Sequence, residues 1–388
     1  MDFAWTEEQQ AFKSSLQSFI EAEIKPHLTS WYRDDVIPRE LFAQMAERQF
    51  LGYREVDGRW VEAPTMNQTI AAEALAEVSP GIAVGLLAHA GLGLYALHRF
   101  GNEAQKERYF LPAVRGELIS AFANTEPTAG SDVANISLQA RPVSGGYLLN
   151  GTKMFITNGT LADFLVVSAV TDPEVRSKHE GISLFVLGTE GLKRRKIRKR
   201  VWTPSDLATL FFEDHFVPEG GLLGELNEGF KLIMRTFTSS RIGLAALAIG
   251  TALGAYRLAL ARANSRETFG KKLFDHQAKA FEFAATLPRL EAARLLVRKA
   301  AWLKDSGQDY TLAASMAKFY ACEEAKAICF FAAEVFGASG IMEDNPIYKY
   351  PLDAWASALG EGTGDIQKLV ISREVRKRLE TTGPQFEI

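Results

Sequence analysis

The stretch Leu359-Gly360-Glu361-Gly362-Thr363-Gly364-Asp365 places a single glutamate among glycines near the C-terminus. The glycines give the backbone unusual freedom and keep bulky side chains away from the carboxylate. Asp365 is predicted to cap a helix over residues 366–379, whose apolar residues fall on one face. A lone glutamate at such a helix start is suited to a general base, although an ordinary capped turn would use the same residues.

Length and composition exclude several classes of protein. The chain has 388 residues, 47% of them hydrophobic, so it can bury a large core and form two or three domains. A net charge of −3 and a pI near 6.2 are unlike the basic balance of nucleic-acid-binding proteins. Cys322 and Cys329 offer neither a disulfide framework nor metal-ligand spacing. This indicates a reducing compartment, which we take to be the cytoplasm.

Neither the N-terminus nor the apolar runs predict a membrane protein. Residues 1–9 are acidic and polar, unlike a signal or transit peptide. The apolar runs 82–97 and 242–256 fall short of the ~20 uninterrupted apolar residues that a membrane span needs. Both are predicted to be helices buried in a multi-helix core.

The hydrophobic pattern divides the chain into three blocks, which gives an α+β fold class. Residues 1–118 show helical patterns, opened by a capping box at 6–9, and predict a helical N-terminal domain without strands. Residues 119–226 predict an antiparallel β-barrel or sandwich, because short strands follow one another without helices, at 119–124, 137–143, 147–156, 164–170, 182–187 and 207–212. Residues 227–388 predict a bundle of long helices, at 228–263, 276–306, 310–336 and from 365 onward.

A run of seven basic residues interrupted by one isoleucine occupies positions 193–200. Such a cluster attracts a phosphorylated substrate or an acidic partner protein. More often, such a run is a solvated edge or loop. Both interpretations stay open at the level of the sequence.

Two further stretches carry groups suited to a flat polar ligand. The segment 125–132 combines hydroxyl groups, small residues and a glycine, so backbone N–H and side-chain O–H groups can approach a ligand closely. In the segment 151–159, Phe155 and Thr157 are two residues apart and are expected to share one face of a strand. Phe155 would then cover a ring such as isoalloxazine while Thr157 bonds its edge; a polar loop and an edge aromatic are the alternative.

Together with Arg266-Glu267-Thr268-Phe269-Gly270 and Glu361-Gly362-Thr363, these stretches resemble the acyl-CoA dehydrogenase family in order and separation over essentially the whole chain. The resemblance implies a helical domain, a β-barrel domain and a C-terminal four-helix bundle. It also implies bound FAD, an acyl-CoA substrate, an electron-transfer flavoprotein as acceptor and a homotetramer built as a dimer of dimers.

The resemblance also assigns residues. It implies FAD contacts, some of them to the FAD of a neighbouring subunit, for Phe122, Thr125, Ser131, Phe155, Thr157, Arg266, Thr268, Phe269, Gln277, Glu334, Gly337, Thr363 and Asp365. It implies substrate contacts for Ser131, Phe237, Arg241 and Gly362. Leu86, Leu87, Leu92 and Phe237 match the acyl cavity, with plain core packing as the alternative.

Glu361 matches the family's catalytic base, which removes the α-proton of the thioester while a β-hydride leaves to the flavin. Some relatives carry the base on an earlier helix, where this chain has Ser240, which cannot serve. Glu334, Phe122 and Asp365 depart from the usual residues of the family, and Glu334 would place a negative charge near the FAD phosphates. These departures indicate a divergent branch.

Three rival functions remain at this stage. The same chemistry on an acyl group tethered to a carrier protein would use the basic run to dock an acidic carrier. A flavin-dependent monooxygenase shares the fold, but such relatives generally lack the catalytic glutamate. A non-catalytic thioester-binding homologue would not need Thr125, Ser131, Arg266 and Glu361 together.

Overall fold

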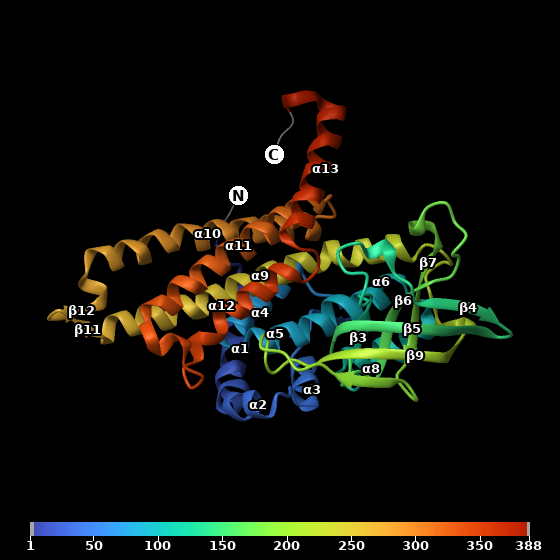
Figure 1. The fold of residues 1–388 in the computed structure, drawn as a ribbon, viewed down its shortest axis with the longest axis horizontal. Helices are drawn as coiled ribbons and strands as arrows, with labels where there is room; N and C mark the ends of the chain where they lie inside the picture. Colours follow the sequence, from blue (N-terminus) through green and yellow to red (C-terminus); the bar gives the residue numbers. More distant parts are fainter. Residues whose placement is uncertain (1–3, 386–388) are drawn as a thin grey trace.

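The computed structural model describes residues 4–385, with helices at both ends of the chain and a sheet between them (Figure 1). The sheet lies at one end of the molecule, and the small hairpin of β11 (Glu267–Thr268) and β12 (Lys271–Lys272) lies at the opposite end (Figure 1). The longest helix, α9 (Gly229–Ser265), begins beside the sheet and ends at that hairpin. This helix therefore connects both ends of the molecule.

The N-terminal helices are α1 (Glu7–Phe19), α2 (Leu28–Asp34), α3 (Arg39–Glu47), α4 (Thr65–Val78), α5 (Pro80–Leu87), α6 (Tyr95–Phe100), α7 (Glu103–Gln105) and α8 (Leu111–Val114). The predicted capping box is confirmed, since the Thr6 side chain accepts from the backbone N–H of Gln9 and the Gln9 side chain accepts from that of Thr6. A π-helical turn, η3 (Ala88–Leu94), separates α5 from α6. Such turns occur frequently at functional sites.

The expectation that this block contains no strand was wrong. Strands β1 (Tyr53–Val56) and β2 (Arg59–Glu62) form an antiparallel hairpin. Its two-residue turn is Asp57-Gly58, in which both residues have positive φ. Asp-Gly is a strong turn signal for such hairpins, but the strands on either side are only four residues long.

The middle block forms an eight-stranded, mostly antiparallel sheet. Its strands are β3 (Ser120–Ala123), β4 (Gln139–Val143), β5 (Gly146–Thr157), β6 (Phe164–Val170), β7 (Ile182–Gly188), β8 (Lys193–Lys196), β9 (Leu207–Pro218) and β10 (Leu222–Leu223). The order is β10-β7-β6-β4-β5-β9-β8, and β3 also pairs with β6. The β3–β6 and β4–β6 pairs are parallel, unlike the expected arrangement. Along the chain, β5 lies between β4 and β6, and the β4–β5 hairpin lies between β3 and β6. Neither parallel pair is therefore joined by a tight turn, which would force an antiparallel arrangement.

The basic run forms an edge of this sheet, as one of its two interpretations expected. Strand β8 ends the strand order and pairs with β9. The Lys193 ammonium and the Arg195 guanidinium each lie 5.6 Å from the centre of the Phe211 ring. Lys196 forms an ion pair with Asp35 at 3.0 Å. Basic side chains on an edge strand discourage pairing with another chain.

The C-terminal block contains α9, α10 (Gln277–Asp305), α11 (Thr311–Val335), α12 (Lys349–Leu359) and α13 (Gly364–Thr382), with β11 (Glu267–Thr268) and β12 (Lys271–Lys272) between α9 and α10. Small residues let the helices approach closely. A Cβ added at Gly250 of α9 would lie 2.2 Å from the Glu73 carbonyl oxygen of α4, so that contact requires glycine. Helix α12 was not expected from the sequence.

The two apolar runs are core helices, as predicted. Pro80–Phe100 and Gly229–Ser265 are long and apolar enough to cross a membrane by length and composition alone. However, 78% of the most apolar window of each is buried inside the structure. Most of their apolar surface is therefore covered by the rest of the protein.

Helix α13 has a different cap from the one predicted. The N-cap is Thr363, whose side chain accepts from the Ile366 N–H, and the helix begins at Gly364. Asp365 lies in the first turn, where its exposed carboxylate pairs with Lys368 at 3.2 Å. The prediction that Asp365 caps this helix was wrong. The helical backbone already begins at Gly364, so the cap position falls on Thr363, which is also a residue type that favours capping.

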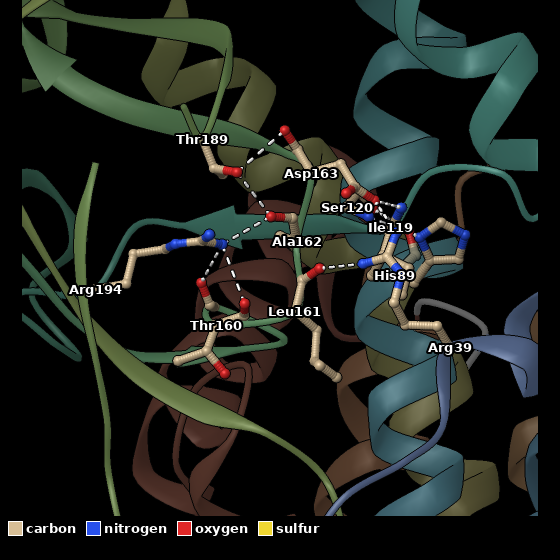
Figure 2. A network of polar contacts seen from close by, with 11 residues as sticks. Arg39, His89, Ile119, Ser120, Thr160, Leu161, Ala162, Asp163, Thr189 and Arg194 are labelled. Carbon is tan, nitrogen blue, oxygen red and sulfur yellow. Dashed lines mark hydrogen bonds and ion pairs between the residues drawn. The ribbon is translucent and has the colours of Figure 1, made fainter. Parts of the chain in front are cut away.

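A polar network fixes the helices against the sheet (Figure 2). Arg39 of α3 donates to the Leu161 carbonyl at 2.7 Å and to the Asp163 carboxylate at 2.6 Å. Asp163 also accepts from the Ile119 N–H at 2.7 Å, just before β3. His89 of η3 is fully buried, and its Nδ1 accepts from the Ser120 N–H at 3.0 Å. These contacts set the position of β3 relative to η3.

Candidate active site

Glu361 lies in the short loop between α12 and α13, with a positive φ of 53°. The Ser240 hydroxyl of α9 donates to its Oε2 at 2.6 Å. Burial raises the pKa of the Glu361 carboxyl to about 7, while the Ser240 hydrogen bond, Lys318 and Arg241 act in the opposite direction. The carboxyl is therefore close to half-ionised at neutral pH, as a general base requires.

Two side chains hold this loop through its main-chain carbonyls. Lys318 of α11 donates to the Ala358 carbonyl at 3.0 Å and to the Gly362 carbonyl at 2.6 Å. Gln367 of α13 donates to the carbonyls of Glu361 and Gly362 at 3.2 and 2.9 Å. Both residues are buried. The positive φ of Glu361 is uncommon for a residue other than glycine, and these contacts fix it.

Arg241 and Gly362, expected at the substrate, contact the loop itself. Arg241 is 5% exposed, and its Nε lies 3.5 Å from the Glu361 carbonyl oxygen. Burial lowers the pKa of Arg241, and the nearby Glu361 raises it. The Gly362 carbonyl accepts from Lys318 and Gln367, as described above. The structure thus shows both residues supporting the loop, and their contact with substrate stays a prediction.

A cavity opens beside the Glu361 side chain. Its walls come from the β1–β2 hairpin, α4, α5, η3, α6, α9 and the Glu361 loop. They are formed by Tyr53, Glu62, Thr65, Gln68, Thr69, Leu87, Ala90, Gly91, Tyr95, Ser239, Ser240, Gly243 and Glu361. Of the four residues matched to an acyl cavity, only Leu87 lines it. Leu86 is 4% exposed and belongs to the core of the N-terminal helices, the alternative that the sequence left open.

Phe237 and Leu92 are partly buried and pack against a core between the helices and the sheet. The rings of Phe237 and Phe122 meet edge to face, with centres 5.8 Å apart. Phe237 precedes Ser240 by three residues on α9, so the two side chains share one face of that helix. This face therefore connects Phe122 of β3 with the Glu361 loop.

One of the residues predicted to contact a flat ring, Phe155, is an exposed aromatic. Phe155 is 55% exposed and has a positive φ of 58°, where the pairing of β5 with β9 is interrupted by a bulge. The strict two-residue alternation expected here is thus broken, although Ile156 between Phe155 and Thr157 is the buried residue. Within residues 4–385, the hydroxyls of Thr125, Ser131 and Thr157 form no hydrogen bond with another side chain or with the main chain. These hydroxyls are available to a ligand.

The second group of predicted ligand residues lies at the opposite end of the molecule, around the β11–β12 hairpin (Figure 1). Phe269 is 99% exposed with a positive φ of 51°, and Arg266 and Gln277 are also exposed. The Arg262 guanidinium, near the end of α9, lies 5.8 Å from the centre of the Phe336 ring, which brings the Glu334–Gly337 segment to the same end. One chain therefore does not bring all the predicted ligand residues together.

Lys318 and Gln367 were missed by the sequence reasoning. The signal for Lys318 is a cation on the apolar side of α11, although Lys326 of the same helix stands between two alanines. A buried lysine in such a position needs acceptors, and here they are the carbonyls of the Glu361 loop. Gln367 gives no comparable signal, because a polar residue on α13 is unremarkable in sequence.

Comparison with known proteins gives a consistent result. The acyl-CoA dehydrogenase N-terminal, middle and C-terminal domain models match residues 6–117, 121–215 and 227–376. The short-chain-specific acyl-CoA dehydrogenase of Clostridium acetobutylicum is 35% identical over 97% of this chain and 100% of its own length. A subunit of the caffeyl-CoA reductase–Etf complex of Acetobacterium woodii is 35% identical over 96% of this chain and 100% of its own.

Solved structures agree. Butyryl-CoA dehydrogenase from Megasphaera elsdenii is 34% identical, with a TM-score of 0.91, covering 97% of this chain and 100% of that chain. The FAD complex of PigA is 29% identical, with a TM-score of 0.91 and the same coverage of both chains.

Proposed function

The chain belongs to the acyl-CoA dehydrogenase family, and on that premise we propose that Glu361 is the base that removes the α-proton in the oxidation of an acyl-CoA thioester to the 2-enoyl-CoA. The observation that carries the proposal is the Glu361 carboxyl itself. It lines a cavity, accepts a short hydrogen bond from Ser240 and has a pKa of about 7.

FAD, when bound, supplies the acceptor for the hydride that leaves the β-carbon. The α-carbon loses its proton to the Glu361 carboxylate, and the Cα–Cβ bond becomes a double bond. The substrate thus loses one proton and one hydride, and the two electrons pass on to an electron-transfer flavoprotein. The similarity to a subunit of an Etf complex supports that acceptor.

The sheet residues fit the flavin ring by the chemistry of their donor set. Three hydroxyls without partners among residues 4–385, those of Thr125, Ser131 and Thr157, would bond the polar edge of the ring, and Phe155 would cover its face. A bulged aromatic with positive φ is a strained feature, and strain of this kind is concentrated at ligand sites.

The separation of the two groups of predicted FAD residues supports a homo-oligomer. The β11–β12 hairpin and the start of α10, which carry Arg266, Thr268, Phe269 and Gln277, lie far from strand β5, which carries Phe155 (Figure 1). They would hold the FAD bound by a second chain, in a tetramer built from two dimers. The exposed Phe269 is suited to contact that second chain.

Replacing Arg266 with alanine is expected to lower FAD content and to weaken the assembly together, because the exposed guanidinium would bond phosphate oxygens across the contact between chains. Flavin absorbance per chain and sedimentation velocity measure the two effects. The control is Arg376→Ala, which removes an exposed arginine of α13. Unchanged FAD content and mass in Arg266→Ala would contradict this assignment.

The activity itself is tested anaerobically. Acyl-CoA esters of different length, branching and ring content are added to the purified yellow protein, and loss of the oxidised-flavin absorbance is followed. Bleaching by one class of ester supports the proposal. Bleaching only by carrier-bound thioesters would favour the carrier-protein alternative, and rapid reoxidation by O₂ with substrate hydroxylation would favour a monooxygenase.

The rate of flavin reduction is expected to rise with pH through about 7, because Glu361 acts as its carboxylate and burial raises its pKa to that value. Ser240→Ala removes the hydrogen bond that lowers this pKa, so the ascending limb should move to higher pH. Stopped-flow rates between pH 5.5 and 9 on the two proteins test this; the same limb in both would show that Ser240 does not tune the base. Ser372→Ala, on the exposed face of α13, is the control.

We further propose a reducing, cytoplasmic location. The thiols of Cys322 and Cys329 are buried and free, and burial raises the pKa of Cys322 to about 11. Both pack as small hydrophobic residues in the core around α11. Free, buried thiols of this kind support a reducing location.

A further inference from the structure

Part of the wall of the cavity beside Glu361 is polar, although apolar surface predominates in the cavity as a whole. Besides Glu361 and Ser240, seven of its lining residues carry polar groups: Tyr53, Glu62, Thr65, Gln68, Thr69, Tyr95 and Ser239. Pockets for hydrocarbon groups are lined mainly by apolar side chains. The polar wall requires its own explanation.

An ion-pair network lies directly behind this wall. Lys304 of α10 has a side chain that is 7% exposed, and its Nζ donates to Glu62 at 2.6 Å and to the Ser239 hydroxyl at 2.7 Å. Arg99 donates to the other oxygen of Glu62 at 2.8 Å. Burial would raise the pKa of Glu62, but Lys304, Arg99 and Gln68 outweigh it, so the pKa is lowered. Glu62 is therefore ionised, and both of its carboxylate oxygens accept hydrogen bonds.

Two phenol groups extend the network. Burial raises the pKa of the Tyr310 phenol, and the side chains of Tyr95 and Ser239 lie close enough to influence that pKa as well. The Tyr95 ring also has the Lys304 ammonium 5.2 Å and the Arg99 guanidinium 5.7 Å from its centre. Lys304 and Arg99 are the cations of the network and Glu62 is its carboxylate, while Glu361 adds a second carboxyl group at the same cavity. The Lys304 ammonium, which donates to the Ser239 hydroxyl, favours an electron-rich oxygen at that point of the wall.

The network belongs to the same cavity as the base. Ser239 is the neighbour of Ser240, which bonds Glu361, and both line the cavity. Between them and Tyr95, the π-helical turn η3 contributes Gly91, where an added Cβ would meet no atom within 4 Å. The π-helical turn and Gly91 thus leave open space where Tyr95 and Ser239 line the wall.

We propose that this enzyme acts on acyl-CoA esters whose acyl group bears an oxygen function, a carboxylate or hydroxyl, which is hydrogen-bonded by Tyr95 and Ser239 next to Lys304. This inference rests on the proposed function, because it takes the cavity beside Glu361 as the acyl site. A hydrocarbon tail would remove water from these buried polar groups without replacing its hydrogen bonds, which is costly. Sites that hydrogen-bond a substrate oxygen reject analogues without it strongly.

The test compares CoA esters of equal length whose terminal carbon is a methyl group, a hydroxymethyl group or a carboxylate, from four to eight carbons. Turnover, as kcat/KM, is measured on the wild-type holoenzyme, and Kd is measured by calorimetry on the Glu361→Gln holoenzyme. We expect the best oxygen-bearing ester to exceed its hydrocarbon counterpart at least tenfold in both, the factor for about one net hydrogen bond. The carboxylate and hydroxyl series separate the two oxygen functions.

Tyr95→Phe and Ser239→Ala each remove a single hydroxyl, and each is expected to lower the ratio of oxygen-bearing to hydrocarbon ester by about tenfold. Tyr147→Phe, which removes a hydroxyl from β5 of the sheet, is the matched control and should leave the ratio unchanged.

Hydrocarbon esters that bind and react as well as oxygen-bearing ones at every length, with ratios unaffected in both variants, would overturn the inference. Calorimetry measures binding without turnover, so it tests the inferred recognition separately from the proposed reaction. If no ester bleaches the flavin but oxygen-bearing esters bind more tightly, the proposed reaction fails while the recognition stands.

Discussion

Glu361→Gln is expected to lower the rate of flavin reduction by about 10²- to 10⁴-fold, the contribution typical of a general base. Glutamine has nearly the same shape and can still accept the Ser240 hydrogen bond, but its amide cannot take a proton from carbon. The loop carbonyls that accept from Lys318 and Gln367 are unchanged by the substitution. Substrate binding should therefore persist while reduction is lost.

Anaerobic stopped-flow reduction measures this rate, and calorimetry measures binding. Glu380→Gln is the matched control, because it makes the same chemical change on an exposed position of α13 and should keep the wild-type rate. A Glu361→Gln enzyme that reduces its flavin within a few-fold of the wild-type rate would show that the base lies elsewhere.

Lys153→Met is expected to destabilise the protein by about 3–5 kcal/mol, the cost of leaving a buried partner charge unpaired. The Lys153 and Glu126 side chains are 0% and 1% exposed, and Nζ lies 2.9 Å from Oε1. Lys153 also donates to the Asn124 carbonyl at 2.9 Å and to the Ser168 hydroxyl at 3.1 Å. Burial lowers the pKa of Lys153 to about 8, against the opposing effect of Glu126.

This ion pair joins the two segments that carry the predicted ring contacts. Glu126 follows Thr125, and Lys153 precedes Phe155 by two residues. The Met154 N–H also donates to the Thr125 carbonyl at 2.8 Å. Loss of the pair should therefore lower FAD content as well as stability.

Denaturant unfolding and flavin absorbance measure the two effects. The double variant Lys153→Met/Glu126→Gln should recover part of the lost stability, because no unpaired charge then remains in the interior. Lys231→Met is the control, since that lysine is 72% exposed and its pair with Glu228 contributes at most about 1 kcal/mol. A Lys153→Met protein as stable as the wild type would contradict the importance of the pair.

Elements with a strong periodic signal were predicted well from the sequence. Strand β6 has the predicted bounds, and α9, α10 and α11 begin and end within two residues of the predicted ranges. These segments follow one hydrophobic period over many residues, so local pattern and tertiary packing agree. The place of Glu361 in a glycine-bounded turn before the last helix was likewise predicted correctly.

Short or polar elements were missed. Strand β8 consists of basic residues, and β1 and β2 have four residues each, so no hydrophobic period marks them. The β1–β2 hairpin nevertheless supplies Glu62 to the polar wall of the cavity. Its role depends on Lys304 and Arg99, which are 242 and 37 residues away along the chain.

Neighbouring residues alone predict the helix–sheet–helix order and the identity of the glutamate, because hydrophobic periodicity and turn chemistry are local properties. The surroundings of that glutamate depend instead on how distant segments pack together. Ser240 and Lys318 reach the Glu361 loop from α9 and α11 and hold the carboxyl in position. Burial raises the pKa of that carboxyl, and the same two residues oppose the rise. Burial and hydrogen bonding between distant segments leave no periodic trace in the sequence, so the chemistry of this site is fixed by packing.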